Sequence, residues 1–174
     1  MIHLFILAVI LGMLLAESRL SRRHEARLRA RGAETPPGDV YVAMAIAYPA
    51  AFVAMGVEGA LRSASADGVF VSGLLLFAAS KGLKYWAIGA LGERWTFRVL
   101  VVPALPLVRS GPYRYVAHPN YVAVVGELAG TALMMHAAVT GPIAFAVFGA
   151  LLWARIRFET AALRRAYDEK TDSP

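Results

Sequence analysis

The chain of 174 residues contains no cysteine, which excludes disulfides, thiolate metal sites and cysteine nucleophiles. Charged residues are also scarce: they make up 17% of the sequence, against about 25% in ordinary soluble domains. The sequence has neither a glycine-rich phosphate-binding motif nor a Gly-x-Ser-x-Gly elbow. No metal site is predicted, because the four histidines are dispersed without the spacing of metal ligands: His3, His24, His118 and His136. Hydrophobic residues, by contrast, make up 58% of the chain, which points to a bilayer as its solvent.

Long apolar stretches predict a single all-α membrane domain over residues 1–174 with five transmembrane helices. The expected spans are about 2–17, 40–61, 69–91, 121–138 and 142–160. The apolar run 121–154 is too long for one span, and Thr140-Gly141-Pro142 divides it, because Thr140 suits a helix cap and Pro142 a first turn. The first stretch lacks the positive n-region of a signal peptide, so we expect a transmembrane helix there.

The basic residues are concentrated in three of the polar segments. Residues 17–39, 81–120 and 155–174 hold 17 of the 18 lysines and arginines, and only Arg62 lies elsewhere. With five spans, these three segments fall on one side of the membrane, which the positive-inside rule makes cytosolic. We therefore expect an inner (plasma) membrane protein of a bacterium with its N-terminus outside and its C-terminus inside. The net charge of +6 then reflects topology, and no nucleic-acid partner is predicted.

The cytosolic segments are predicted to be 18–39, 92–120 and 161–174. The first is a basic, helix-like stretch ended by Gly32 and Pro36-Pro37-Gly38, and we interpret it as an interfacial helix lying on anionic headgroups. Glu17 at its start is expected to be solvated. The second holds four prolines, which rule out a regular helix, and many apolar side chains, which argue against disorder. We expect it to form an ordered cap over the cytosolic mouth of the bundle.

Polar residues with the character of a site gather before the fourth predicted helix, in His118-Pro119-Asn120-Tyr121. Pro119 is well placed to begin that helix, so His118 and Asn120 are expected near its N-terminus, where free backbone N–H groups favour an anionic group. The spacing alone leaves two interpretations open: an anion site, or a helix cap followed by an interfacial tyrosine.

Three further charged residues stand in apolar surroundings. Arg155 and Glu159 are four residues apart on one face of the fifth helix, a spacing that by itself indicates an ion pair. Glu127 lies two turns into the fourth helix, and an ionisable group at that depth is a functional hypothesis by default. Its alternative is an internal ion pair, for which Arg155 and Arg98 are the candidate partners.

The motif 111–121 (GPYRYVAHPNY), followed after two apolar helices by Arg155-x-x-x-Glu159, resembles the isoprenylcysteine carboxyl methyltransferase family. Members of that family are membrane-embedded enzymes that use S-adenosylmethionine. The resemblance covers roughly 81–165. Segments 21–25 (SRRHE) and 91–96 (LGERWT) are similar to a bacterial branch that works beside type III polyketide synthases on alkylresorcinols and alkylpyrones. One departure is Ala117, where the family usually has arginine; Arg114 is the candidate to replace it.

The resemblance implies roles for individual residues. Residues matching cofactor-contacting positions are Tyr113, His118, Pro119, Asn120, Tyr121 and Glu159, with the stretch Leu105, Pro106, Leu107 and Val108 alongside the cofactor and Arg98 near another such position. Arg155 matches the arginine that faces the methyl acceptor, where it is the candidate clamp for an oxyanion. Glu127 is a candidate base for a phenol, whose pKa of about 10 requires deprotonation or stabilisation of the phenolate.

The function predicted from these residues is transfer of a methyl group from S-adenosylmethionine to an oxygen of a lipid-like small-molecule acceptor at the cytosolic membrane boundary, with a phenolic lipid such as an alkylresorcinol or alkylpyrone favoured. Three alternatives stay open. One is a prenylcysteine-type carboxyl methyltransferase. Another is an NADPH-dependent membrane sterol or lipid reductase, because the Gly-Pro-Tyr and His-Pro-x-Tyr parts also resemble that class. The last is a non-enzymatic membrane interaction subunit.

Overall fold

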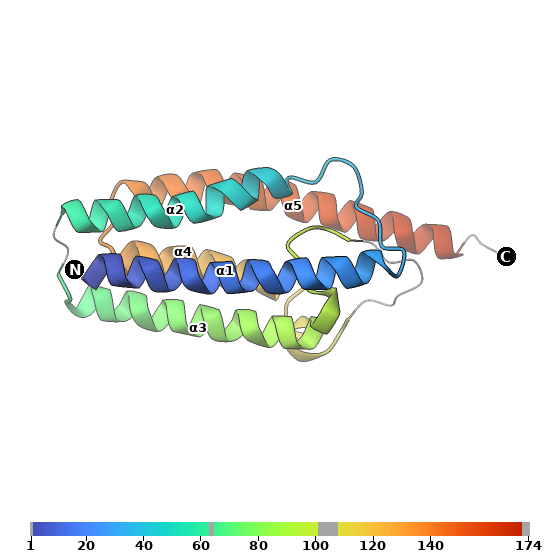
Figure 1. Ribbon diagram of the computed structural model, residues 1–174, viewed down its shortest axis with the longest axis horizontal. Coiled ribbons are helices and arrows are strands. Elements are labelled where there is room, and N and C mark those ends of the chain that lie inside the picture. The colour runs from blue at the N-terminus through green and yellow to red at the C-terminus, as the bar shows by residue number, and fades with distance from the viewer. Residues whose placement is uncertain (1, 63–64, 101–107, 172–174) are drawn as a thin grey trace.

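The computed structural model describes residues 2–62, 65–100 and 108–171, with side chains as far as residue 161. In these ranges the chain is all-helical, with no β-strand. The five α-helices are α1 (Ile2–Arg29), α2 (Tyr41–Leu61), α3 (Gly68–Leu91), α4 (Pro119–Met134) and α5 (Thr140–Thr171), with short 3-10 turns η1 (Gly92–Arg94) and η2 (Gly111–Arg114). The helices run side by side along the long axis, and α5 continues past the others toward the C-terminus (Figure 1).

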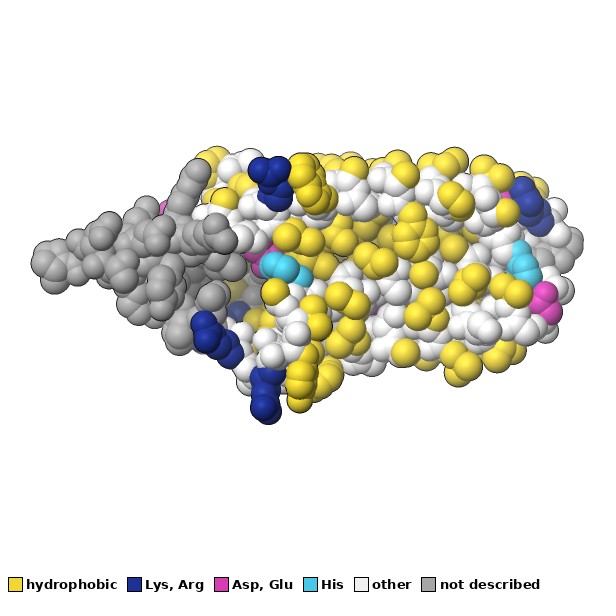
Figure 2. All heavy atoms as spheres, turned by 180° about the vertical axis from the view of Figure 1, so that it is seen from behind, with side chains coloured by type: hydrophobic (Ala, Val, Ile, Leu, Met, Phe, Trp, Pro, Cys, Tyr) yellow, Lys and Arg dark blue, Asp and Glu magenta, His cyan; other side chains and the backbone are white. Residues whose placement is uncertain are grey.

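Four of the five predicted spans are confirmed as helices long and apolar enough to cross a membrane: α1, α2, α3 with η1, and the part of α5 from Thr140 to Ala161. Figure 2 shows the corresponding surface, with hydrophobic side chains over the middle of one face and lysines and arginines toward the ends. The fourth predicted span is shorter than expected, because α4 ends at Met134. Sixteen residues measure about 24 Å, less than a hydrocarbon core of about 30 Å, so a fifth full crossing stays a prediction.

The division of the chain at Thr140 is confirmed, because α5 begins there and Pro142 lies in its first turn. The cap comes from another helix than expected. Glu58 of α2 accepts hydrogen bonds from the backbone N–H of Thr140 at 2.7 Å, from its hydroxyl at 2.6 Å and from the N–H of Val139 at 3.1 Å. A carboxylate at a helix N-terminus satisfies free donors and the helix dipole together.

The separate interfacial helix expected over 17–39 is not present, because α1 runs without a break from Ile2 to Arg29. The buried residues in its second half are Glu17, Ser21, His24 and Leu28. Their spacing of four, three and four residues makes one stripe along the helix. This stripe faces protein, and α1 packs here against η1. The prediction of a separate helix was wrong because this buried stripe continues α1 past Glu17, whereas contact of the exposed arginines with headgroups stays a prediction.

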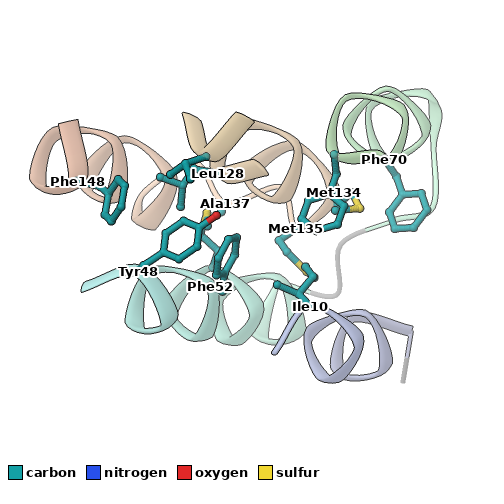
Figure 3. Close-up of a cluster of buried hydrophobic side chains, with 12 residues drawn as sticks. Ile10, Tyr48, Phe52, Phe70, Leu128, Met134, Met135, Ala137 and Phe148 are labelled. Atoms are coloured by element: carbon teal, nitrogen blue, oxygen red, sulfur yellow. The ribbon is translucent and has the colours of Figure 1, made fainter. Parts of the chain in front are cut away.

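The apolar core lies between all five helices. Tyr48 and Phe52 of α2 stack edge-on at 4.7 Å between ring centroids, and Tyr48 lies 5.0 Å from Phe148 of α5. Figure 3 shows these rings together with Leu128 of α4. The core holds α2, α4 and α5 together, and at one end of the bundle the starts of α2 and α4 lie beside the middle of α5. We call this the loop end: it carries residues 30–40, 92–100 and 108–118 (Figure 1).

The helices α3 and α4 approach so closely that glycine is required on both. A Cβ built on Gly73 would lie 2.6 Å from the carbonyl oxygen of Gly130, and one on Gly130 would lie 2.7 Å from the carbonyl oxygen of Gly73. We expect Gly73→Ala to lower the free energy of unfolding by about 1–3 kcal/mol, because the two backbones must separate. Unfolding in detergent, followed by circular dichroism, measures the change.

The matched control is Gly82→Ala on the same helix, where an added Cβ meets no atom within 4 Å. Alanine is the better helix former, so this variant is expected to gain up to about 1 kcal/mol. Equal effects of the two substitutions would contradict the close approach of α3 and α4.

Candidate active site

Arg155 of α5 is the centre of the polar residues at the loop end. Its guanidinium group is buried and pairs with the carboxylate of Asp39, which lies just before α2. Nη2 donates to the carbonyl oxygen of Phe97 at 2.6 Å, and Nε donates to the hydroxyl of Tyr121 at 3.3 Å. Three segments distant in the sequence therefore meet at one planar group, whose fork of donors suits several fixed acceptors at once.

Asp39 is itself held from two other directions. Its carboxylate accepts hydrogen bonds from the backbone N–H of Tyr41 at 3.0 Å and of Val99 at 3.2 Å. The first bond fixes Asp39 at the start of α2, and the second ties it to the loop after η1. Asp39 was not among the sequence candidates, and a lone acid beyond Pro36-Pro37-Gly38 gave no signal of its partner.

Tyr121 connects Arg155 to Glu159. Its hydroxyl accepts from Arg155 and donates to the carboxylate of Glu159. The i,i+4 ion pair expected between Arg155 and Glu159 is therefore not formed in the described residues: Asp39 pairs with the arginine and the tyrosine with the glutamate. The Tyr121 hydroxyl therefore connects the cation of Arg155 to the anion of Glu159 in one hydrogen-bond network, although the two charged groups do not contact each other.

The segment before α4 supplies aromatic faces and the start of a helix. Pro119 begins α4 as predicted, and the ring of His118 stacks on Tyr121 with 5.3 Å between centroids and 24° between planes. His118 occupies the N-cap position of α4, as the helix-cap interpretation predicted, but its side chain makes no capping hydrogen bond. Because Pro119 has no N–H, Asn120 provides the first backbone donor of the helix. Tyr113 in η2 is half-buried, and its burial, together with the nearby Glu159 carboxylate, raises the pKa of its phenol.

Asn120 of the motif makes a structural contact through Trp95 to α1. The amide oxygen of Asn120 accepts from the indole N–H of Trp95 at 3.3 Å, and the carbonyl oxygen of Trp95 lies 2.8 Å from Nδ1 of His24. Since a carbonyl only accepts, that nitrogen of His24 carries a proton. Trp95 thus joins α1 to the start of α4. Residues 21–25 and 91–96 carry the resemblance to the bacterial branch. Nothing in the sequence predicts that these two segments contact each other.

The remaining candidates lie apart from Arg155 or outside the described residues. Arg98 stacks over the ring of Tyr41 at 4.1 Å and lies 3.6 Å from the carboxylate of Glu25, so it faces α1 and α2. Arg114 is exposed and lies against Tyr115. Val108 is half-buried. Leu105, Pro106 and Leu107 lie outside the described residues.

Glu127 is not paired with Arg155 or Arg98. Its carboxylate lies 2.9 Å from Lys81 Nζ and 2.8 Å from Lys84 Nζ, and it accepts a hydrogen bond of 2.8 Å from the hydroxyl of Tyr48. The internal ion pair predicted as the alternative for Glu127 is therefore confirmed, but its partners are two lysines of α3 and not the arginines named as candidates. Glu127 also lies six residues beyond Tyr121, about 9 Å along α4. The structure therefore separates it from the group around Arg155.

Curated proteins are similar to this chain over most of its length. The chain is 29% identical over 160 residues to an uncharacterized protein of Bacillus subtilis (strain 168), YpbQ, covering 91% of this chain and 95% of the relative. It is 27% identical over 161 residues to an uncharacterized protein of Haemophilus influenzae, covering 92% and 94%. No solved structure gives a significant match. Residues 72–165, more than half of the chain and including every motif around Arg155, match the family described as "Isoprenylcysteine carboxyl methyltransferase (ICMT) family". The chain therefore belongs to the isoprenylcysteine carboxyl methyltransferase family, whose members are membrane methyltransferases with S-adenosylmethionine as methyl donor.

Proposed function

We propose that this protein transfers a methyl group from S-adenosylmethionine to an oxygen of a lipid-like acceptor, at the cytosolic boundary of a bacterial inner membrane. The observation that carries the proposal is the network Arg155–Tyr121–Glu159 beside the start of α4, because it places a cation, an anion and aromatic faces together at the loop end. The basic residues of the chain gather at this end, which supports the cytosolic orientation.

The side chains around Arg155 fit the chemical groups of S-adenosylmethionine. Glu159 is half-buried and offers a carboxylate to the amino group, and the N-terminus of α4 offers backbone N–H donors to the carboxylate. The stacked rings of His118 and Tyr121 provide a flat apolar surface for the adenine. When bound, the cofactor supplies a methyl group on a positively charged sulfur. The protein's own part is to orient the acceptor oxygen in line with that methyl group and to exclude water.

Asp39 gives a physical reason to favour a neutral acceptor. The carboxylate of Asp39 already balances the charge of Arg155, so an acceptor carboxylate would have to compete with it for the guanidinium group. A phenolic hydroxyl is neutral, so it does not compete with Asp39 for the guanidinium group, and its proton can pass to the Asp39 carboxylate while Arg155 stabilises the oxygen that attacks the methyl group. We therefore favour a phenolic lipid, such as an alkylresorcinol or alkylpyrone, over a prenylcysteine carboxylate. Because both carboxylate oxygens of Glu127 lie against lysines, we assign the catalytic role to Arg155 alone.

The test is a methyl-transfer assay with radiolabelled S-adenosylmethionine on the purified protein in detergent. Alkylresorcinols, alkylpyrones and prenylcysteine are offered separately, and we expect label in the phenolic lipids. Titration with S-adenosylmethionine and with NADPH accompanies the assay. Saturable binding of NADPH without binding of S-adenosylmethionine would overturn the proposal in favour of a reductase. Labelling of prenylcysteine alone would overturn the choice of acceptor but not the reaction.

A further inference from the structure

Four charged side chains form a closed ring inside the bundle: Glu17 of α1, Lys81 and Lys84 of α3, and Glu127 of α4. Lys81 Nζ lies 2.6 Å from Glu17 and 2.9 Å from Glu127, and Lys84 Nζ lies 3.0 Å from Glu17 and 2.8 Å from Glu127. Each lysine therefore touches both glutamates. We call these four residues the charge ring. Glu17, expected to be solvated, is only 3% exposed, and each of the other three is at most 5% exposed.

The charge ring is electrically balanced and has little capacity left for a ligand. It holds two ammonium groups and two carboxylates, and Tyr48 of α2 donates to Glu127. Lys81 also lies over the ring of Phe77 at 5.6 Å, and Lys84 over that of Tyr48 at 5.4 Å, so each ammonium group has a third favourable contact. Burial of four charges is expensive and adds little to stability compared with apolar packing. The role of the charge ring is therefore best explained as structural specificity: it selects one packing arrangement of the helices that carry it.

The arrangement in question is the position of α1. The backbone of α1 packs closely against α2 and η1, and Ile10 of α1 joins the apolar core. Glu17 adds a buried charged contact to both lysines of α3 and, through these lysines, to Glu127 of α4. A shift of α1 by one residue would rotate Glu17 by 100° and leave both lysines without one of their counterions. The charge ring therefore fixes the rotation and the height of α1 against the α3–α4 pair.

The same face of α1 continues directly into the loop that contacts Arg155. Ser21, one turn beyond Glu17, accepts a hydrogen bond of 2.8 Å from the backbone N–H of Phe97. His24, the next residue of the stripe, contacts the carbonyl oxygen of Trp95. The carbonyl oxygen of Phe97 in turn accepts a hydrogen bond from Arg155, and the indole N–H of Trp95 donates one to Asn120. Any error in the position of α1 is thus passed to both sides of the candidate active site.

We propose that Glu17 and the charge ring are positioning residues for this site: they place α1 so that Ser21 and His24 hold residues 95–97 against Arg155 and Asn120. The inference rests on the proposed function for its effect on catalysis. Its effect on the position of residues 95–97 is independent of that function and is measured separately.

The first measurement uses Trp95 as a reporter of the loop. The three tryptophans of the chain are Trp86, Trp95 and Trp153, and replacing the exposed Trp86 and Trp153 with phenylalanine leaves Trp95, which is 2% exposed, as the sole emitter. In this background we expect Glu17→Gln to increase the quenching of Trp95 by acrylamide, because one charge of the ring becomes unbalanced and α1 loses its register. Circular dichroism checks that the helices are retained.

The matched control is Glu93→Gln. Glu93 of η1 also links to α1, through Arg27 at 2.7 Å, and to Arg31 just after α1 at 2.8 Å, but both pairs are exposed and worth little. We expect parental quenching from this variant. The double variant Glu17→Gln/Lys81→Gln removes one charge of each sign, and we expect it to return quenching toward the parental value. This variant also keeps the test valid if Glu17→Gln alone does not fold.

The second measurement is methyl transfer by the same variants. We expect Glu17→Gln to lower kcat by about 10- to 100-fold, as a displaced reacting group does, and to leave KM for the acceptor close to the parental value. The inference is overturned if Trp95 in Glu17→Gln is as shielded as in Glu93→Gln, or if the double variant is no closer to the parent than the single one. A parent that transfers no methyl group would instead contradict the proposed function, and the quenching result would still decide the role of the charge ring.

Discussion

Replacement of Arg155 by lysine is expected to lower kcat/KM for methyl transfer by about 100-fold. The guanidinium group contacts Asp39, the carbonyl oxygen of Phe97 and the hydroxyl of Tyr121 at the same time. A lysine keeps the charge that balances Asp39, but one ammonium nitrogen does not span three acceptors held in a plane. The acceptor oxygen then loses its oriented donor. Initial rates over a range of acceptor concentrations, at saturating S-adenosylmethionine, measure the loss.

Arg157→Lys is the matched control for this prediction. Arg157 lies two residues further along α5, is exposed, and stacks over Trp153 at 4.8 Å. Its replacement is expected to leave turnover near the parental value. The more drastic Arg155→Ala leaves the buried carboxylate of Asp39 without its cation and is expected to cost about 3–5 kcal/mol of stability as well as activity. If Arg155→Lys has parental activity, Arg155 does not take part in the reaction, and its role is to balance the charge of Asp39.

Binding of S-adenosylmethionine is expected to weaken by about 10- to 100-fold when Glu159 is replaced by glutamine, because a charge-assisted hydrogen bond to the amino group of the cofactor becomes a neutral one. Glutamine keeps the shape of the side chain and still accepts from Tyr121, so the fold is expected to persist. Isothermal titration calorimetry of the purified protein with S-adenosylmethionine gives the dissociation constant directly, without the methyl acceptor.

Glu34→Gln is the control for general loss of negative charge, since Glu34 is exposed in the loop between α1 and α2. Tyr121→Phe separates two effects of the network. It removes the hydroxyl between Arg155 and Glu159 but leaves the ring on which His118 stacks, so we expect a smaller loss of affinity than in Glu159→Gln. If Glu159→Gln and Glu34→Gln bind the cofactor equally well, Glu159 does not contact it.

The helices were largely predictable from local pattern. The apolar runs locate α2 and α3 closely, and Thr140-Gly141-Pro142 marks the start of α5, because a cap residue and a proline act on the backbone within a few residues. The predictions for α1 and α4 were less accurate at their ends. α1 passes through the predicted membrane boundary because its stripe of buried residues continues, and α4 stops at Met134 although four of the next five residues, up to Val139, are apolar. The C-terminal ends of α1 and α4 therefore depend on tertiary contacts with other segments, which local sequence pattern does not contain.

The candidate site was predictable as a set of positions and not as a set of contacts. Pro112, Pro119 and the pair Arg155 and Glu159 stand out in the sequence by type and spacing. The partners that give them meaning, Asp39 and the carbonyl oxygen of Phe97, lie 116 and 58 residues from Arg155. Every residue has a carbonyl oxygen, so the sequence does not show which one accepts from Arg155. An isolated aspartate in a loop belongs to no periodic pattern, so the sequence does not show which way its side chain points.

By itself, the sequence determined that this chain is a helical membrane protein, with its basic residues concentrated in three segments and with the motifs of a methyltransferase family. These properties follow from composition and from spacings of a few residues, which act locally on helix formation and on partition into a bilayer. Only the tertiary structure decided which charges meet. In the folded bundle Asp39 pairs with Arg155, and the two lysines of α3 pair with Glu17 and Glu127. The phenol of Tyr121 donates a hydrogen bond to Glu159. Charges buried in a bundle must be balanced by whichever group packing brings near, and packing is a property of the assembled helices.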